Sequence, residues 1–179
     1  SYFLPRNLGG VYGQFTVAMP EGQAGTKYSG LRLGYASGAL DIAASYGQTP
    51  VEGLHYRNAS LGGSYDFGLA KLYANYLQQK APNDKQTNIM LGLSVPGGAG
   101  VIKASVARSN RSGPGVDADD ATQLAVGYVH WLSKRSAIYG TWSKIRNKGN
   151  AAYVVTDALK DPQAGASSRG FQIGISHNF

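Results

Sequence analysis

The sequence contains no cysteine at all. Disulfide bonds and thiolate metal sites are therefore excluded, and cysteine usage leaves the redox compartment open. The chain also lacks any run approaching the ~20 consecutive apolar residues that a membrane-spanning helix requires, which excludes a helical membrane protein. A transmembrane β-barrel is not excluded, because its strands are apolar on only one side.

Charged side chains are scarce, and the basic ones dominate. They make up 15% of the chain, with 17 basic and 10 acidic residues and a net charge of +7. This excess predicts an attraction to anions. The opening SYFLPRNLGG lacks the basic start, apolar middle and cleavage site of a signal peptide, so we expect either that a leader has been removed or that the chain begins within a longer protein.

Recognisable catalytic patterns are absent as well. The sequence has no nucleophile motif, no phosphate-binding loop and no paired catalytic carboxylates, and His55, His130 and His177 share no ligand spacing. We therefore expect no enzyme activity, no cofactor, no metal and no nucleic-acid partner.

What the chain has in abundance is glycine (25), tyrosine (12) and an apolar alternation of period two. In residues 169–179 the side chains of Phe171, Ile173 and Ile175 alternate with small or polar ones, and a period of two places the two sets on opposite faces of a strand. The pattern recurs along the chain and predicts about ten strands with one apolar and one polar face each. The predicted strands are 10–19, 28–36, 40–48, 55–67, 70–80, 87–95, 101–108, 121–132, 137–146 and 169–179. Strand 137–146 is ambiguous, because both of its faces carry an aromatic residue.

The links between these strands alternate in length. Short links rich in turn formers lie at 37–39, 66–68, 96–100 and 132–136, and longer polar links lie at 20–27, 48–55, 79–87, 109–120 and 147–168. This order predicts an all-β, antiparallel, up-and-down transmembrane barrel with short turns at one rim and long loops at the other. No domain boundary is visible, so we expect residues 1–179 to form one barrel domain, with a short helix near 157–160. Tyrosines near strand ends are expected in the two interfacial belts: Tyr35, Tyr46, Tyr65, Tyr76 and Tyr128.

Several motifs carry a family resemblance. They are YFLP at 2–5 followed by NLGG and YGQ, GY at 127–128, LSKRS at 132–136 followed by YG, and GISHNF at 174–179. With these motifs the chain resembles the general diffusion porins of Gram-negative bacteria, most closely the β-proteobacterial type. The Ser-Lys-Arg turn and the closing aromatic are the most specific, whereas Asn178 stands where the family usually has arginine.

The resemblance implies a larger assembly than this chain. Porins of this family are homotrimers of sixteen-stranded barrels in the outer membrane, in contact with its lipid. The ten predicted strands resemble the last ten of the sixteen. The N-terminal strands and the loop that narrows the pore would then lie outside this sequence, and a self-contained ten-stranded barrel is the alternative. The resemblance also implies an assembly signal, read by the barrel-insertion machinery, in the last strand: Phe171, Ile173, Ile175, His177 and Phe179.

If the apolar face meets lipid, the polar face lines water and its charges select ions. Pores that pass anions carry rings of Lys and Arg. The predicted pore-lining residues are the cations Arg32, Lys71 and Lys103, with Tyr73, Asn75 and the acid Asp41 beside them. The expected function is passive diffusion of small hydrophilic solutes and ions, with small anionic solutes preferred.

Three questions stay open at this point. Basic residues near the longer links (Arg57, Lys80, Arg108, Lys144 and Arg146) could funnel anions, bind phosphates of outer-leaflet lipid, or be solvated. Asp117, Asp119 and Asp120 could hold calcium, although their spacing does not match an EF-hand and a solvated loop is favoured. The barrel itself could be non-conducting (an enzyme or an adhesin), or a soluble lipocalin-like binder with its apolar face inward.

Overall fold

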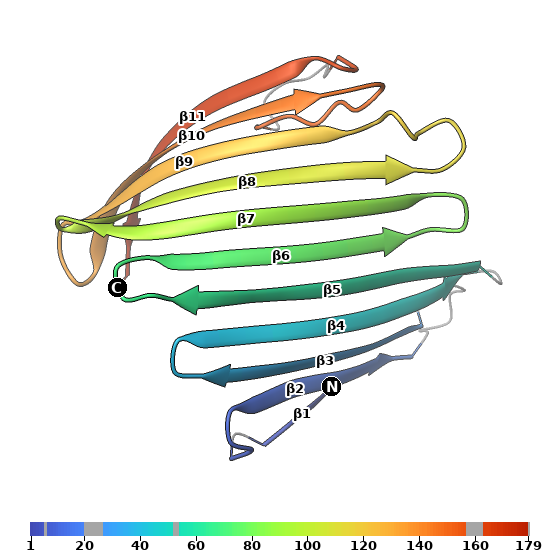
Figure 1. Cartoon of the computed structure of the whole chain (residues 1–179), viewed down its shortest axis with the longest axis horizontal. Coiled ribbons are helices and arrows are strands. Elements are labelled where there is room, and N and C mark those ends of the chain that lie inside the picture. Colours follow the sequence, from blue (N-terminus) through green and yellow to red (C-terminus); the bar gives the residue numbers. More distant parts are fainter. Residues whose placement is uncertain (6, 20–26, 52–53, 157–162, 179) are drawn as a thin grey trace.

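The described residues form one open antiparallel sheet. The computed structural model describes residues 1–5, 7–19, 27–51, 54–156 and 163–178. Eleven strands follow one another in sequence order, each hydrogen-bonded to its neighbours (Figure 1). They are β1 (Tyr2–Phe3), β2 (Val11–Ala18), β3 (Tyr28–Ser37), β4 (Leu40–Val51), β5 (Leu54–Asp66), β6 (Lys71–Lys80), β7 (Lys85–Gly97), β8 (Gly100–Ser112), β9 (Ala121–Trp131), β10 (Ser136–Asn147) and β11 (Ser167–His177).

The ten predicted strands correspond to β2–β11. The extra strand, β1, pairs Tyr2 with Phe15 and Phe3 with Gln14. Two residues are too few to display an alternation, so the sequence pattern could not predict it. Among the described residues, no helix is long and apolar enough to cross a membrane.

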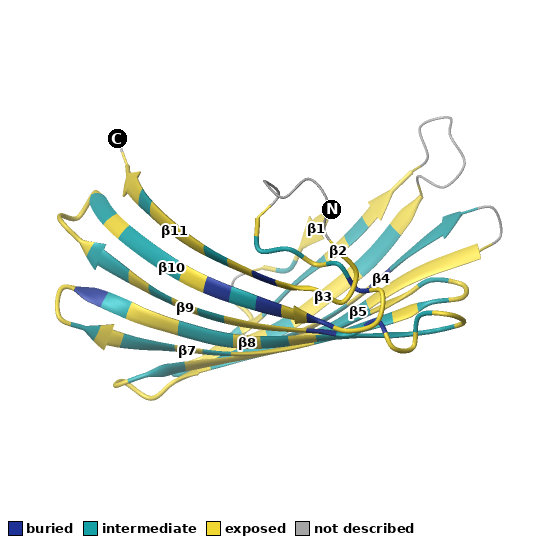
Figure 2. Ribbon diagram, turned by 90° about the horizontal axis from the view of Figure 1, so that it is seen from above, coloured by how far each residue is buried: buried dark blue, intermediate teal, exposed yellow. Residues whose placement is uncertain are grey.

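The sheet bends into a trough and does not close on itself (Figure 2). Among the described residues, β11 pairs with β10 alone and β1 pairs with β2 alone. The two edges of the sheet are therefore not joined, and the alternative of a self-contained ten-stranded barrel is wrong. The architecture is that of part of a barrel wall.

The register gives the sheet an apolar face, here called the outer face. Residues directly opposite one another share a face, and one row across it reads Leu40, Tyr65, Leu72, Leu93, Ala104, Val126, Trp142 and Phe171. The apolar side chains of this face are exposed in the described structure: Leu91 is 56% exposed and Ile173 is 74% exposed. In the described part of the chain, the buried hydrophobic residues are only Ala121, Ile145 and Ala151. A soluble lipocalin-like binder needs a dry apolar interior, so that alternative is wrong.

The opposite, inner face is polar and lines the inside of the trough. One row across it reads Gln14, Arg32, Ser45, Ser60, Leu77, Asn88 and Ser109. Tyrosine rings lie over glycines here: a Cβ added to Gly34 would lie 2.3 Å from the ring of Tyr12, and one added to Gly174 equally close to the ring of Tyr139. Tyr139 is therefore on the inner face. Strand β10, which was ambiguous in sequence, thus has an outer and an inner face in the same register as the other strands.

The five tyrosines predicted for the interfacial belts all lie on the outer face. Tyr35, Tyr65 and Tyr128 lie toward one end of the strands. Tyr46 and Tyr76 lie where the apolar side chains give way to Gln48 and Gln78. The apolar band thus has aromatic residues at both of its edges, the arrangement typical of transmembrane barrels.

The two rims of the sheet differ, although less than the link lengths predicted. One rim, the turn rim, holds the links 38–39, 67–70, 98–99 and 132–135, and the other, the loop rim, holds the links that follow β2, β4, β6, β8 and β10. The predicted long links 48–55 and 79–87 are mostly strand, because the backbone ladder continues through polar pairs such as Gln48–Arg57 and Gln79–Gln86. Side-chain polarity does not prevent backbone pairing, so strict alternation of link length is wrong at these two places. The predicted helix near 157–160 lies outside the described residues.

Candidate functional site

Most of the predicted pore-lining residues meet in one hollow of the inner face. It has a volume of about 430 Å³, and Arg32, Asp41, Tyr73 and Asn75 all line it. Tyr12 lines it as well, and the sequence analysis did not identify that residue as functional. The sequence did contain a signal for Tyr12. It occupies a polar-face position of its strand, two residues from Gln14, which pairs with Arg32.

Within this hollow the acid accepts a hydrogen bond, whereas the cation has no ion-pair partner among the described residues. The hydroxyl of Tyr12 donates a hydrogen bond of 2.5 Å to the carboxylate of Asp41. The guanidinium of Arg32 lies 5.3 Å from the centre of the Tyr12 ring, a cation–π distance. Arg32 is exposed and makes no ion pair with another described residue. Its charge therefore faces the water in the trough.

Lys71 and Lys103 form a second basic group nearer the turn rim. Both lie directly opposite Ser94, one on each side of β7. The ammonium of Lys71 is 5.6 Å from the centre of the Tyr73 ring. Lys103 lines a neighbouring hollow of about 460 Å³ together with Tyr73 and Ser105. Tyr73 thus borders both hollows and connects the two basic groups.

The link after β10 folds back over the inner face, which the sequence did not predict. The buried side chain of Asn147 donates hydrogen bonds to the carbonyls of Tyr153 (2.9 Å) and Ala166 (2.6 Å), and accepts one from the Tyr153 amide (3.2 Å). Val155 lies over Gly170, where an added Cβ would be 2.9 Å from its side chain. We call residues 148–156 the inner segment. Periodicity carries no information on the direction of a loop, so this arrangement had no sequence signal.

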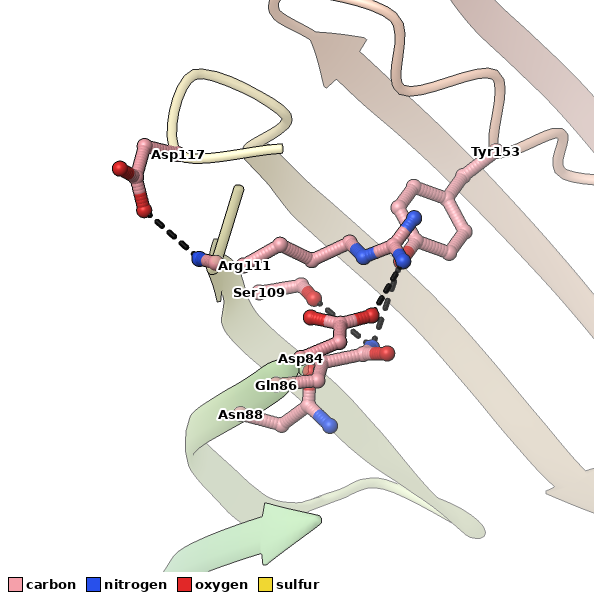
Figure 3. A network of polar contacts seen from close by, with 8 residues as sticks. Asp84, Gln86, Asn88, Ser109, Arg111, Asp117 and Tyr153 are labelled. Atoms are coloured by element: carbon pink, nitrogen blue, oxygen red, sulfur yellow. Dashed lines mark hydrogen bonds and ion pairs between the residues drawn. The ribbon is translucent and has the colours of Figure 1, made fainter. Parts of the chain in front are cut away.

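A polar network joins the inner segment to the wall at the loop rim (Figure 3). The Gln86 amide donates to the hydroxyls of Ser109 (3.0 Å) and Tyr153 (3.3 Å). Next to it, Arg111 pairs with Asp84. The charge of Arg111, an inner-face cation that the sequence analysis missed, is therefore compensated, in contrast to those of Arg32, Lys71 and Lys103.

The carboxylates of the acidic loop between β8 and β9 make structural contacts, one within the loop and two with neighbouring elements. Asp117 accepts a hydrogen bond from the Gly113 amide (2.8 Å), and the buried Asp119 accepts one from the Asn150 amide (2.6 Å). Asp120 lies 3.6 Å from Arg108. The three acids face different partners, and the described residues contain no group of three side chains that could hold a metal ion.

The predicted assembly signal lies on the outer face of the edge strand β11. Phe171, Ile173 and Ile175 are 68%, 74% and 75% exposed. Nδ1 of His177 lies 2.9 Å from the hydroxyl of Ser136, at the turn rim. Phe179 lies outside the described residues.

Comparison with known proteins gives a consistent result. Residues 1–150 match the family model for Gram-negative porins. The whole chain is 37% identical to outer membrane porin protein 32 of Delftia acidovorans and covers 55% of it. An anion-selective porin from Comamonas acidovorans superposes with a TM-score of 0.88 at 34% identity, over 99% of this chain and 58% of that one. In vitro folded OmpT of Vibrio cholerae, at 15% identity and a TM-score of 0.75, shares the fold. The chain thus spans a little over half the length of these relatives.

Replacing Asn147 with alanine should release the inner segment. The change removes three hydrogen bonds of a buried amide, which together contribute roughly 1–3 kcal/mol. We expect amide hydrogen exchange in residues 148–156 to become about tenfold faster or more, measured by mass spectrometry on the membrane-inserted protein. Asn75→Ala is the matched control, because Asn75 lies on the same face without a side-chain hydrogen bond to a described residue. Equal exchange in both variants would mean that Asn147 does not hold the segment.

Proposed function

The chain belongs to the Gram-negative porins of the outer membrane, and from that premise we propose that it forms part of the wall of a water-filled channel through which small hydrophilic solutes and ions diffuse passively, with a preference for anions. Porins are channels rather than enzymes, so the function resides in the shape and charge of the lumen. The observation that carries the proposal is the contrast between the two faces of the sheet. The outer face is apolar and uncovered, while the inner face is polar and carries uncompensated cations.

The charges of the inner face support the anion preference. Arg32, Lys71 and Lys103 have no ion-pair partner among the described residues. The two acids at the described inner-face strand positions both accept hydrogen bonds: Asp41 from the Tyr12 hydroxyl, and Asp66 from the Gly68 amide at a turn (2.8 Å). A mobile anion therefore meets positive charge that has not already been neutralised, as in pores that pass anions.

The magnitude of the effect makes the preference graded. A fixed charge about 4 Å from an ion changes its energy by roughly 1 kcal/mol in bulk water and about 4 kcal/mol near a protein surface. Salt screens this interaction over about 8 Å at physiological ionic strength. Cations are therefore disfavoured in the channel but not excluded from it.

The sheet has two open edges, which further strands would have to cover in a membrane. The backbone groups at both open edges of the sheet would be unpaired in hydrocarbon, where each unsatisfied group costs several kcal/mol. We infer that strands outside this sequence, N-terminal in the family order, complete the wall. Residues 1–179 then form a single domain that is part of a sixteen-stranded barrel, and the barrel assembles as a homotrimer like other porins of the family.

Reversing the charge of Arg32 tests the selectivity proposal. In Arg32→Glu the hollow loses a positive charge and gains a negative one, so we expect the chloride-over-potassium permeability ratio to fall about fivefold or more, which corresponds to ~1 kcal/mol. The measurement is the reversal potential across a planar bilayer in a salt gradient. Lys134→Glu makes the same charge change in the exposed β9–β10 turn, where salt screening predicts a much smaller shift. An unchanged reversal potential in Arg32→Glu would show that Arg32 does not contribute to ion selectivity.

The apolar face of β11 is proposed as the assembly signal. Each isoleucine moved into hydrocarbon contributes roughly 1.5–3 kcal/mol, so Ile173→Ser with Ile175→Ser should reduce folded, heat-resistant protein in outer membranes several-fold. Gln172→Ser with Ser176→Thr alters the inner face of the same strand and should leave this amount near the unmodified level. Deleting Phe179 belongs in the same series, with a loss of assembly expected. Normal yields from the double isoleucine variant and from the deletion would refute the signal.

A further inference from the structure

The outer face of the sheet contains a hollow of about 710 Å³ over β8–β11, the strands at its C-terminal edge (Figure 1). Gly140 lies at the centre of this hollow, opposite Tyr128 on β9 and Ile173 on β11. Along the same face of β10 its neighbours are Ile138 and Trp142, which also line the hollow. The missing side chain of Gly140 thus leaves a notch among large apolar ones, and we call this feature the Gly140 hollow.

The fold itself does not require glycine at the centre of the hollow. Gly140 has no positive φ, and an added Cβ would meet only Phe171 and Ile173, at ordinary contact distances of 3.7–3.8 Å. The ring of Tyr128 does not close the notch, because its hydroxyl donates a hydrogen bond (3.0 Å) to the carbonyl of Gly97 at the turn-rim end of β7. The space over Gly140 is therefore available to a ligand.

The hollow has the depth of one leaflet of a membrane. From Ile138 to Trp142 the strand rises about 13 Å, at about 3.3 Å per residue. Half of a hydrocarbon core that is about 30 Å thick is about 15 Å. Strand β10 begins at Ser136 on the turn rim, so the hollow starts two residues from that rim. It therefore lies beside the acyl chains of the leaflet at the turn rim.

Two cations lie in the turn that joins β9 to β10, at the turn-rim end of the hollow. Lys134 and Arg135 are exposed and make no ion pair with another described residue. The turn has a defined shape, since the Ser133 hydroxyl accepts a hydrogen bond (3.1 Å) from the Arg135 amide. Three other links at this rim contain no charged residue: 38–39, 67–70 and 98–99. Among these four links, positive charge is thus confined to the end of the Gly140 hollow.

Hydrogen-bonding side chains lie on the outer face between the hollow and this turn. Nδ1 of His130 lies 3.3 Å from the Tyr128 hydroxyl, and Nδ1 of His177 lies 2.9 Å from the Ser136 hydroxyl. Hydroxyl and imidazole groups can donate to the carbonyl oxygens of acyl esters. From mid-strand to turn, the surface is thus apolar, then hydrogen-bonding, then cationic. This is the order of acyl chain, glycerol ester and phosphate in a glycerophospholipid.

We propose that the Gly140 hollow and the β9–β10 turn form a binding site for one anionic glycerophospholipid of the leaflet at the turn rim. One acyl chain lies over Gly140, the ester groups lie beside His130 and Ser136, and the phosphate lies at Lys134 and Arg135. Arginine binds phosphate through two parallel hydrogen bonds, and lysine binds it as a point charge. The site faces away from the trough, so this function is separate from the passage of solutes.

A second copy of this chain fits the hollow less well than a lipid does. Its outer face could cover the apolar side chains, but the described outer-face strand positions contain neither Asp nor Glu. Such a partner would therefore bring no carboxylate from its strands to Lys134 and Arg135. A lipid phosphate supplies the negative charge and the acyl chain in one molecule.

A second outer-face hollow serves as an internal control for the test. It has a volume of about 370 Å³ and is lined by Leu40, Leu72, Ala74 and Leu91. The links at its turn-rim end, 38–39 and 67–70, contain no charged residue. Both hollows offer apolar side chains, but only the Gly140 hollow combines them with cations at the turn rim. An anionic headgroup should therefore favour the Gly140 hollow over this one.

The test maps photo-crosslinks from phospholipids that carry a diazirine in one acyl chain. The protein is purified from outer membranes and placed in phosphatidylcholine nanodiscs with a small fraction of labelled phosphatidylglycerol or of labelled phosphatidylcholine with the same chains. Mass spectrometry gives the ratio of crosslinks in residues 138–142 to those in residues 72–76. We expect this ratio to be roughly 25-fold higher for phosphatidylglycerol, from a factor of about five for each of the two cations.

Three variants assign the effect to the turn and to the notch. In Lys134→Gln/Arg135→Gln the ratio should become nearly equal for the two lipids. Gly140→Leu fills the notch and should lower crosslinking in residues 138–142 about fivefold, the effect of losing about ten carbon–carbon contacts. Ala74→Leu, the matched control, adds the same side chain to the second hollow and should leave crosslinking in 138–142 unchanged. Heat-modifiable gel mobility confirms that the variants are folded.

Two results would overturn the proposal. One is an equal ratio for the two lipids in the unmodified protein, or an unchanged ratio in the folded turn variant, which would identify ordinary contact with acyl chains. The other is an absence of lipid crosslinks in 138–142 together with loss of trimers in Gly140→Leu, which would identify a second copy of the chain as the occupant. Neither result bears on the selectivity proposed for the inner face, because the reversal potential measures that separately.

Discussion

The structure depends on one constraint, that the two faces of a single sheet meet different surroundings. Side chains alternate with a period of two, so a slip of one residue in any strand would move its entire apolar set to the other face. The register from β2 to β11 keeps the two sets apart, since outer-face residues oppose only outer-face residues and inner-face residues oppose only inner-face ones. In the described part of the chain only three hydrophobic side chains are buried, so the sheet depends on the match between each face and its surroundings.

On the inner face, the proposed selectivity rests on which charges already have a partner among the described residues. Asp41 is occupied by Tyr12 and Arg111 by Asp84, whereas Arg32 is left to the water in the trough. The inner segment adds a second layer above the same face, held by Asn147 and linked to the wall through Tyr153. The proposed charge selection and the path of the inner segment thus depend on different residues, so each can be altered separately. The same division applies across the wall, where outer-face cations such as Arg57 and Lys144 face away from the trough.

The features that depend on the alternation of apolar and polar side chains could be predicted from the sequence. The strands, the two faces and the shared face of Arg32, Asp41 and Asn75 follow from a period of two, because that period fixes the side of each residue. It does not fix what a loop does. The inward path of the inner segment is set by the amide of Asn147 and the small Gly170. The ion pair of Arg111 with Asp84 joins β8 to the link between β6 and β7, and no local sequence pattern relates these two residues. The links predicted at 48–55 and 79–87 were too long for a related reason. Residues with polar side chains, such as Gln79, still pair with the neighbouring strand through their backbone hydrogen bonds.

The central claim concerns which face meets hydrocarbon, and site-directed spin labelling tests it most directly. Because the chain has no cysteine, single cysteines can be introduced one at a time along β7, at Asn88, Ile89, Met90 and Leu91. Collision rates of the attached nitroxide with oxygen report on lipid, and those with a water-soluble nickel chelate report on water. The account predicts that labels at 89 and 91 collide with oxygen and those at 88 and 90 with the nickel chelate. The reverse assignment, or no alternation along the strand, would contradict it.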